Sequence, residues 1–99
     1  MTINVERNFE LVTLEITGRL DTTTAPNLET VINEISEDTK ELIFNMAELE
    51  YISSAGIRVL LSAYKKMNQS GGIMRIEMEN DIVREVFEMT GLLEMLNQE

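Results

Sequence analysis

The spacing of apolar residues changes repeatedly along this chain of 99 residues, and these changes limit the folds that it can adopt. A period of two indicates a half-buried strand, whereas apolar residues three and four positions apart indicate a helix. Strand-like patterns occupy residues 2–6, 12–17, 41–46 and 72–78, and helical patterns occupy residues 24–35, 54–69 and 80–89. This alternation predicts an α/β domain spanning residues 1–99, with a small mixed sheet of about four strands, a mostly parallel core and an antiparallel N-terminal edge. Three to four helices should pack on the sheet.

The boundaries of these segments follow from single residues. Gly18 is expected to end the second strand, and Thr24 should cap the first helix, with Pro26 in its first turn. Asn80 should cap the last full helix, and residues 91–96 indicate a final helical turn. The apolar stripes predicted to face the core are Leu28, Val31, Ile32 and Ile35 in the first helix, Ile57, Leu60, Leu61 and Tyr64 in the second, and Ile82, Val83, Val86 and Phe87 in the third.

The composition argues against several classes of function. The chain has no Cys and no His, which removes thiol and imidazole catalysis and the usual zinc and haem ligands, so neither a metal nor a cofactor is expected. The net charge of −10 disfavours nucleic acids and anionic membrane surfaces. It allows a protein partner with a basic face, although solubility alone is enough to explain the charge. No apolar run reaches the length of a membrane span and no signal peptide is recognised, so a cytoplasmic protein is expected.

Three loops are expected at the carboxyl ends of the strands, where open α/β sheets bind ligands and partners. They are residues 18–24, 47–56 and 79–82. This topology predicts that Asp21 and Ser54 lie on the same rim of the sheet, although they are far apart in the sequence. Asp21 is open to two interpretations, a turn residue that hydrogen-bonds its own loop or part of a functional site.

The segment Tyr51–Gly56 places two serines at a corner between an apolar run and a helix. A serine in this position usually caps the helix, which suits Ser53. Ser54 would then be the first helical residue, with its hydroxyl exposed and Arg58 one turn further along. The small side chains of Ala55 and Gly56 leave the backbone open to close approach. A phosphate on Ser54 would meet free backbone N–H groups and Arg58, so phosphorylation is chemically reasonable here.

Several motifs, taken in order, resemble the STAS domain family of bacterial anti-sigma factor antagonists over residues 3–96. "GRLD" at 18–21 resembles the G-x-L-D that follows the second strand of the family. "IFNMAELEYISSAGIRVLL" resembles its most specific block, an apolar strand with Asp or Asn, then D-S-S/T-G and an apolar helix. "SGGIMRIE" and "VREVFEMTGLLEML" resemble the last strand and final helices. Asn45 matches the Asp or Asn of the strand, whereas Ser53 replaces the Asp of the motif and Ala55 replaces its second Ser or Thr.

The resemblance implies a phosphorylation switch rather than catalysis. It implies that Ser54 is the phosphoacceptor, with Ser53 as a possible rival, and that Asp21, Thr22, Ser53, Ala55, Gly56 and Arg58 form the partner-binding or switch loops. The implied partners are an anti-sigma factor with serine kinase activity, which the unmodified protein sequesters to free a sigma factor, and a metal-dependent, PP2C-type phosphatase. The exposed side of the second helix, with Ser54, Arg58, Ser62 and Lys65, is expected to contact the anti-sigma factor. The free protein is expected to be a monomer.

Two other classes of function are open at this stage. An enzyme would need a Lys or carboxylate base beside a nucleophile, and no such spacing or Gly-rich phosphate loop is present in the sequence. A STAS domain could instead act as a scaffold or nucleotide-sensing subunit in a transport or other signalling complex, without being phosphorylated.

Overall fold

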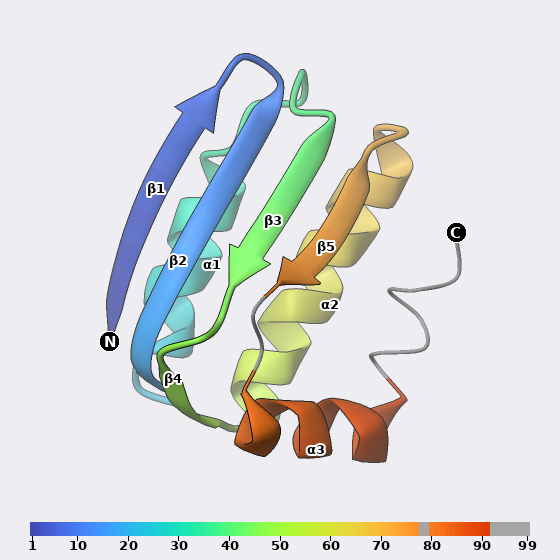
Figure 1. The fold of residues 1–99 in the computed structure, drawn as a ribbon. Coiled ribbons are helices and arrows are strands. Elements are labelled where there is room, and N and C mark those ends of the chain that lie inside the picture. The colour runs from blue at the N-terminus through green and yellow to red at the C-terminus, as the bar shows by residue number, and fades with distance from the viewer. Residues whose placement is uncertain (78–79, 92–99) are drawn as a thin grey trace.

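The N-terminal hairpin forms one edge of the sheet. A computed structural model describes residues 1–77 and 80–91, and in it strands β1 (Thr2–Asn8) and β2 (Leu11–Leu20) pair antiparallel (Figure 1). Ile3 lies opposite Ile16 and Val5 opposite Leu14, so the apolar residues of both strands share the face that packs on the core. The two alternating patterns are thus confirmed as strands, and β1 extends two residues beyond the predicted alternation.

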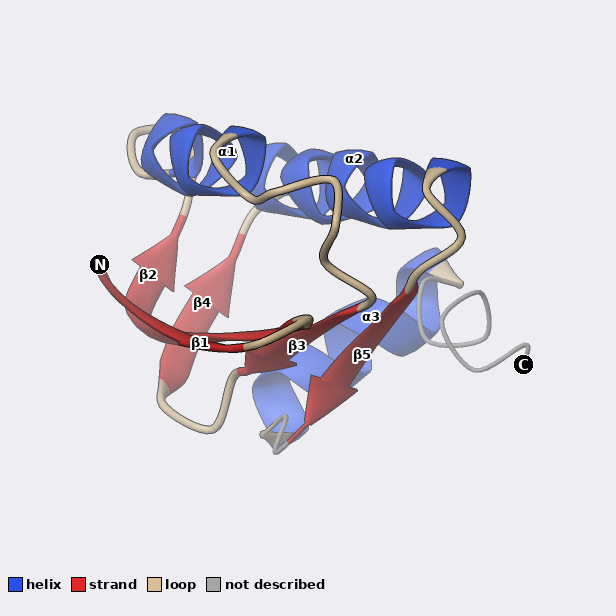
Figure 2. Cartoon of the chain, turned by 90° about the horizontal axis from the view of Figure 1, so that it is seen from above, coloured by secondary structure: helices blue, strands red, loops and turns tan. Residues whose placement is uncertain are grey.

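The parallel part of the sheet is built from β2, β3 (Glu41–Asn45) and β5 (Ile73–Glu77) in the spatial order β1-β2-β3-β5. Helices α1 (Ala25–Asn33) and α2 (Ser54–Gln69) cover one face of this sheet (Figure 2). Helix α3 (Asp81–Thr90) packs against the end of the sheet instead. This mixed α/β architecture, with an antiparallel N-terminal edge, is the predicted fold class.

A fifth strand, β4 (Leu49–Ile52), lies inside the segment 47–56 that we predicted to be a loop. It pairs parallel to the second half of β2, whereas β3 pairs with the first half. The prediction that Gly18 ends the second strand is wrong, because β2 continues through this residue to Leu20. Gly18 has a φ of 89° and marks a shift in register between β2 and β4. Glycine adopts this backbone conformation without strain, which lets the strand bend and continue.

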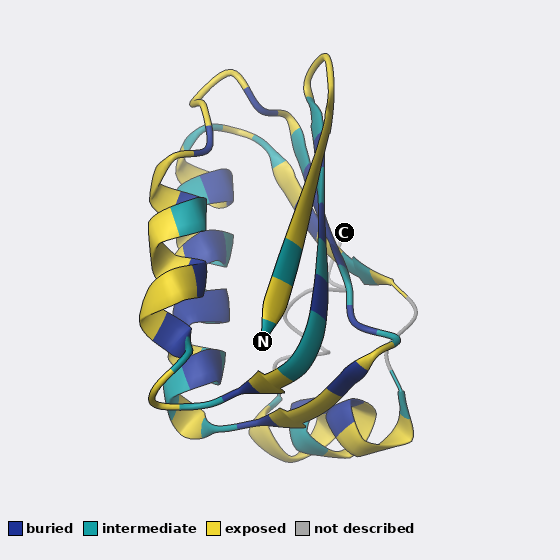
Figure 3. Ribbon diagram, turned by 90° about the vertical axis from the view of Figure 1, so that its left-hand side faces the viewer, coloured by how far each residue is buried: buried dark blue, intermediate teal, exposed yellow. Residues whose placement is uncertain are grey.

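The buried face of α2 differs from the predicted stripe. Leu60 is buried as expected, but Ile57, Leu61 and Tyr64 are only half-buried at the margin of the core. Figure 3 shows that the buried parts of the helical layer face the strands, whereas its exposed parts face outward. In α2 the buried residues are Gly56, Val59, Leu60, Ala63 and Met67. Small side chains at two of these five positions allow the helix to approach the strands closely.

Only part of the predicted apolar stripe of α3 packs against the protein. Val83 and Phe87 are fully buried, one helical turn apart, while Ile82 is 58% exposed. The prediction that Ile82 is buried is therefore wrong. Asn80 caps the helix as predicted, because its side-chain oxygen accepts a hydrogen bond from the backbone N–H of Val83 at 2.9 Å. Most of the predicted final turn at 91–96 lies outside the described residues.

The predicted stripe of α1 is largely confirmed. Leu28 and Ile32 are buried, Val31 is half-buried, and Ile35 is buried just beyond the end of the helix. Lys66 of α2 reaches this end and donates hydrogen bonds from Nζ to the carbonyl oxygens of Ile32 and Ile35, at 2.8 and 2.9 Å. Lysine side chains often bind the last carbonyl groups of a helix, and because Lys66 belongs to α2 these bonds fix the end of α1 against α2.

Candidate functional site

The carboxyl ends of β2 and β4 bring the two predicted site segments together. Leu20 and Ile52 are paired at the ends of these strands, and the backbone N–H of Ser53 donates to the carbonyl oxygen of Leu20 at 2.9 Å. Asp21 and Ser53 are therefore the next residues on two adjacent parallel strands, and Ser54 begins α2 directly afterwards. The structure thus places Asp21 and the serine pair on one rim, as the topology predicted.

The two serines occupy different positions at the start of α2. Ser53 is the N-cap residue, and its Oγ accepts a hydrogen bond from the backbone N–H of Gly56 at 3.3 Å. Ser54 is the first helical residue and is exposed, and its hydroxyl forms no hydrogen bond with any residue that the structure describes. One hydroxyl is therefore used to stabilise the helix terminus, and the other is free to react or to contact a partner.

Asp21 organises the turn that precedes α1. Its Oδ1 accepts hydrogen bonds from the backbone N–H groups of Thr23 and Thr24, at 3.0 and 3.1 Å, and its Oδ2 lies 3.6 Å from Nε of Arg19. The Thr24 hydroxyl closes the turn by accepting from the backbone N–H of Asp21 and donating to the carbonyl oxygen of Arg19. Thr24 is the N-cap position, but its side chain makes these loop contacts instead of capping α1. One Asp21 oxygen is thus committed to its own loop.

The hydrogen bonds of this turn predict an acid-sensitive loop. The backbone N–H of Thr24 makes the largest contribution to lowering the pKa of Asp21 below its ordinary value of 3.8, followed by the N–H of Thr23. A carboxylate whose pKa is lower in the folded state stabilises that state above its unfolded pKa, and this stabilisation is lost as the pH falls through the folded pKa. We expect the carboxyl carbon of Asp21 to titrate below pH 3.8 by NMR, with the amide signals of Thr23 and Thr24 shifting at the same midpoint. An Asp21→Asn variant should show no such midpoint at these amides. Titration of Asp21 above pH 3.8 would contradict this description of the turn.

Gly56 is buried where α2 approaches the two strand ends. A Cβ atom at this position would lie 2.7 Å from Cγ of Leu20 and 3.1 Å from Cγ1 of Ile52. Both neighbours are themselves buried core residues. Gly56 is therefore required for internal packing, and a side chain added there would meet the protein's own core before it met a partner.

A hollow of about 210 Å³ lies between the N-terminal halves of α1 and α2. It is lined by Thr22, Ala25, Pro26, Glu29, Ala55, Arg58, Val59 and Ser62. Four of the residues expected on the switch loops or the exposed side of α2 are therefore brought together here. Neither Arg58 nor Glu29 forms an ion pair with a described residue. Lys65 is also exposed on α2 but does not line the hollow.

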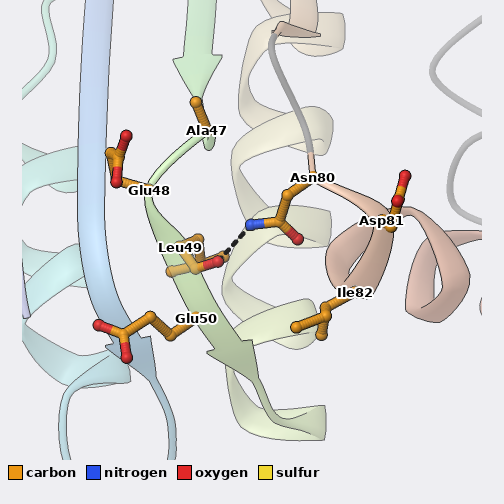
Figure 4. Close-up of a pocket in the computed structure, with 7 residues that line it drawn as sticks. All are labelled: Ala47, Glu48, Leu49, Glu50, Asn80, Asp81 and Ile82. Carbon is orange, nitrogen blue, oxygen red and sulfur yellow. Dashed lines mark hydrogen bonds between the residues drawn. The ribbon is translucent and has the colours of Figure 1, made fainter.

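A second hollow, of about 610 Å³, lies between β4 and the start of α3 (Figure 4). Ala47, Glu48, Leu49, Glu50, Asn80, Asp81 and Ile82 line it. They belong to the segments 47–56 and 79–82 that were predicted as loops at the carboxyl ends of the strands, but none of them is among the predicted phosphoacceptor and switch-loop residues. The Nδ2 group of Asn80 donates to the carbonyl oxygen of Leu49 across this hollow. Because Asn80 also caps α3, one side chain both starts the helix and attaches it to β4. The sequence indicates the cap but contains no signal for the attachment.

A contact on the outer side of the rim was not predicted from the sequence. The guanidinium carbon of Arg19 lies 4.2 Å from the centre of the Tyr51 ring, a cation–π distance. The pair forms because Arg19 and Tyr51 are partners in the β2–β4 register. Only knowledge of β4 could have revealed it. Both side chains are exposed and stand beside Asp21 and Ser53.

Among residues 1–77 and 80–91, no group of three or more Asp or Glu side chains is arranged to hold a metal ion. None of the helices in the same ranges combines the length and the hydropathy needed to cross a membrane.

Comparison with known proteins places this geometry in a family. The model of the STAS domain matches residues 2–98. The anti-sigma-B factor antagonist of Staphylococcus aureus (strain NCTC 8325) is 27% identical over 100 residues, covering 98% of this chain and 93% of that protein. The anti-sigma factor antagonist SpoIIAA of Bacillus superposes in its unphosphorylated form with a TM-score of 0.70 at 16% identity, covering 99% of this chain and 100% of that one. The phosphorylated form of SpoIIAA superposes with a TM-score of 0.73 at 20% identity, covering 94% of this chain and 86% of that one. A sulfate transporter family protein from Wolinella succinogenes superposes with a TM-score of 0.80 at 23% identity, covering 93% of this chain and 75% of that one. The chain belongs to the STAS domain family.

Proposed function

We propose that this protein is an anti-sigma factor antagonist whose binding to an anti-sigma factor is switched by phosphorylation of Ser54. The observation that carries the proposal is the exposed Ser54 hydroxyl, which has no hydrogen bond to a described residue and opens α2 beside the capping Ser53. The name of the Staphylococcus aureus relative supports the antagonist role. The solved phosphorylated form of SpoIIAA shows that a protein of this fold accepts phosphate.

The modification is a phosphoryl transfer in which this chain is the substrate. The partner is an anti-sigma factor that is also an ATP-dependent serine kinase. The γ-phosphoryl group of ATP passes to Oγ of Ser54, ADP leaves, and a base on the kinase takes the hydroxyl proton. A metal-dependent phosphatase of the PP2C type returns Ser54 to its free form by hydrolysis of the phosphoester. Ser54 suits this exchange because its hydroxyl is accessible, whereas Ser53 is engaged at the helix terminus.

The unmodified protein binds the anti-sigma factor through the start and exposed side of α2. Ser54, Arg58 and Ser62 are exposed on this helix, and Thr22 and Ala55 extend the surface toward the Asp21 turn. Asp21 acts by holding this turn, because its carboxylate bonds the turn's own backbone. Gly56 acts by seating α2 against Leu20. We assign the partner contact itself to the exposed residues.

A competition experiment tests this function directly. A complex of an anti-sigma factor and its sigma factor, from the genome that encodes this protein, is loaded on a size-exclusion column with and without the purified chain. We expect the unphosphorylated chain to comigrate with the anti-sigma factor and the sigma factor to elute free. Addition of ATP should reverse the exchange as Ser54 is phosphorylated, while a Ser54→Ala chain should keep the anti-sigma factor bound.

The transport or scaffold alternative makes a different prediction for the same samples. The Wolinella succinogenes protein shares the fold, which carries no argument for a shared function. A scaffold or nucleotide-sensing domain would leave every anti-sigma complex of that genome intact and would gain no mass in the presence of ATP. Those two results together would reject the proposed function.

A further inference from the structure

Arg58 occupies the position from which a cation reaches a phosphate on Ser54. The two residues are four positions apart in α2, and side chains with this spacing lie one above the other on the same face of a helix. Long helical side chains lean toward the helix N-terminus, so the side chain of Arg58 can reach the turn that begins with Ser54. An acidic group that precedes a basic one by four residues is the favourable order of such a pair.

Arg58 is also available for this contact. It is exposed, and its guanidinium group forms no ion pair or hydrogen bond with a described residue. The carboxylate that shares its hollow, Glu29 of α1, lies beyond ion-pair distance. The guanidinium group is planar and matches the oxygens of a phosphate with two parallel hydrogen bonds. A doubly charged phosphate on the same helix face would outcompete the single charge of Glu29.

We propose that Arg58 binds the phosphate of phosphorylated Ser54 within the same helix, an inference that rests on the proposed phosphorylation. This contact gives the modification two effects on the surface of this chain that binds the anti-sigma factor. The phosphate adds roughly −1.5 to −2 charges at Ser54. At the same time it withdraws Arg58 from any partner carboxylate, and Arg58 is the only cation among the described residues that line the hollow between α1 and α2. Arg58 is thereby a positioning residue, which holds the phosphate against the start of α2.

The test uses protein with phosphoserine incorporated at position 54 during translation, so that it requires no kinase. The pH titration of the 31P resonance is compared in the wild type, Arg58→Gln and Lys65→Gln. Lys65→Gln is the matched control, because it removes one positive charge from an exposed side chain of the same helix. We expect the wild-type phosphate to titrate at a pH lower by about 0.3–0.7 unit than in Arg58→Gln, given the strength of helical ion pairs and of charged hydrogen bonds. Lys65→Gln should match the wild type, and Arg58→Lys should retain part of the difference.

A second measurement reports on the guanidinium group itself. The 15N-labelled Arg58 Nε–H resonance should shift on phosphorylation, and its exchange with water should slow, while the same resonance of Arg75 stays unchanged. The proposal would be overturned if the 31P resonance titrated at the same pH in the wild type and in Arg58→Gln. It would also be overturned if Lys65→Gln shifted the titration as much as Arg58→Gln, because the shift would then reflect the general electrostatic field of the helix. Either result would leave the proposed function intact. Failure of every kinase to modify Ser54 would reject the proposed function but not this contact.

Discussion

Replacement of Ser54 by Asp should weaken binding to the anti-sigma factor by roughly a hundredfold or more, because a charge in a closely packed contact must lose its water. Ser54 is exposed and begins α2, so a carboxylate there should leave the fold intact and even interact favourably with the helix N-terminus. Isothermal titration of the wild type and Ser54→Asp with the anti-sigma factor measures the loss of affinity, and circular dichroism checks that the fold is kept. Ser54→Ala should bind as tightly as the wild type.

A matched control separates position from charge. Gln69→Glu adds one negative charge at an exposed position in the last turn of the same helix. We expect it to bind within about twofold of the wild type, because exposed charges at this distance are screened by salt. If Ser54→Asp bound as well as Gln69→Glu, Ser54 would lie outside the contact and the proposed switch would fail.

Replacement of Gly56 by Val should destabilise the fold by about 3 kcal/mol or more, through overpacking against buried neighbours. The first added carbon already lies 2.7 Å from Cγ of Leu20, which is fully buried in the core. Gly56→Ala should cost less, because alanine regains up to about 1 kcal/mol of helix propensity. Denaturant unfolding measures both changes. The same two substitutions would be stabilising or neutral if α2 were free to move away from the strands.

A double-mutant cycle identifies the neighbour responsible. Leu20→Ala alone should destabilise the protein by about 2–5 kcal/mol, as expected for a buried leucine. Combined with Gly56→Val it should cost clearly less than the sum of the two single changes, because the valine fills the space that Leu20 leaves. Additive losses would show that Leu20 does not constrain Gly56.

The regular patterns of the sequence predicted most of the fold. The alternation in β1 and β2 and the short apolar runs of β3 and β5 each produced the expected strand. Strand β4 was missed because only Leu49 and Ile52 of its four residues are buried, three positions apart, which matches neither the strand period nor a continuous apolar run. Because β4 pairs with β2 from Gly18 to Leu20, β2 also extends beyond Gly18. Pairing between distant segments leaves no local pattern in the sequence, so this extension could not be predicted.

The buried face of α2 was misjudged for a different reason. Gly56 and Ala63 lie at the closest approach to the sheet, and periodicity of large apolar residues gives such small residues no weight. The predicted stripe therefore included Ile57, Leu61 and Tyr64, which lie at the margin of the core. The weight given to large apolar residues also placed Ile82 in the stripe of α3, where Val83 and Phe87 are buried, Val86 packs at the margin of the core and Ile82 is exposed.

The candidate site was predicted more completely in its local parts than in its long-range ones. The corner at 51–56 predicted that Ser53 caps α2 and that Ser54 is exposed, and the structure confirms both placements. The topology also predicted the shared rim with Asp21. The functional roles of these residues stay predictions. The attachment of Asn80 to Leu49 and the stacking of Arg19 on Tyr51 depend on β4, so they could not be predicted without it.

Acceptance of phosphate by Ser54 underlies the proposed switch, and it can be measured with two serine variants. The wild type, Ser53→Ala and Ser54→Ala are incubated with the anti-sigma factor kinase and ATP, and intact mass and phosphopeptide mapping follow. We expect one phosphate on the wild type and on Ser53→Ala, in both cases on Ser54, and none on Ser54→Ala. Phosphate on Ser53, or a Ser54→Ala chain that is modified as fast as the wild type, would contradict the account.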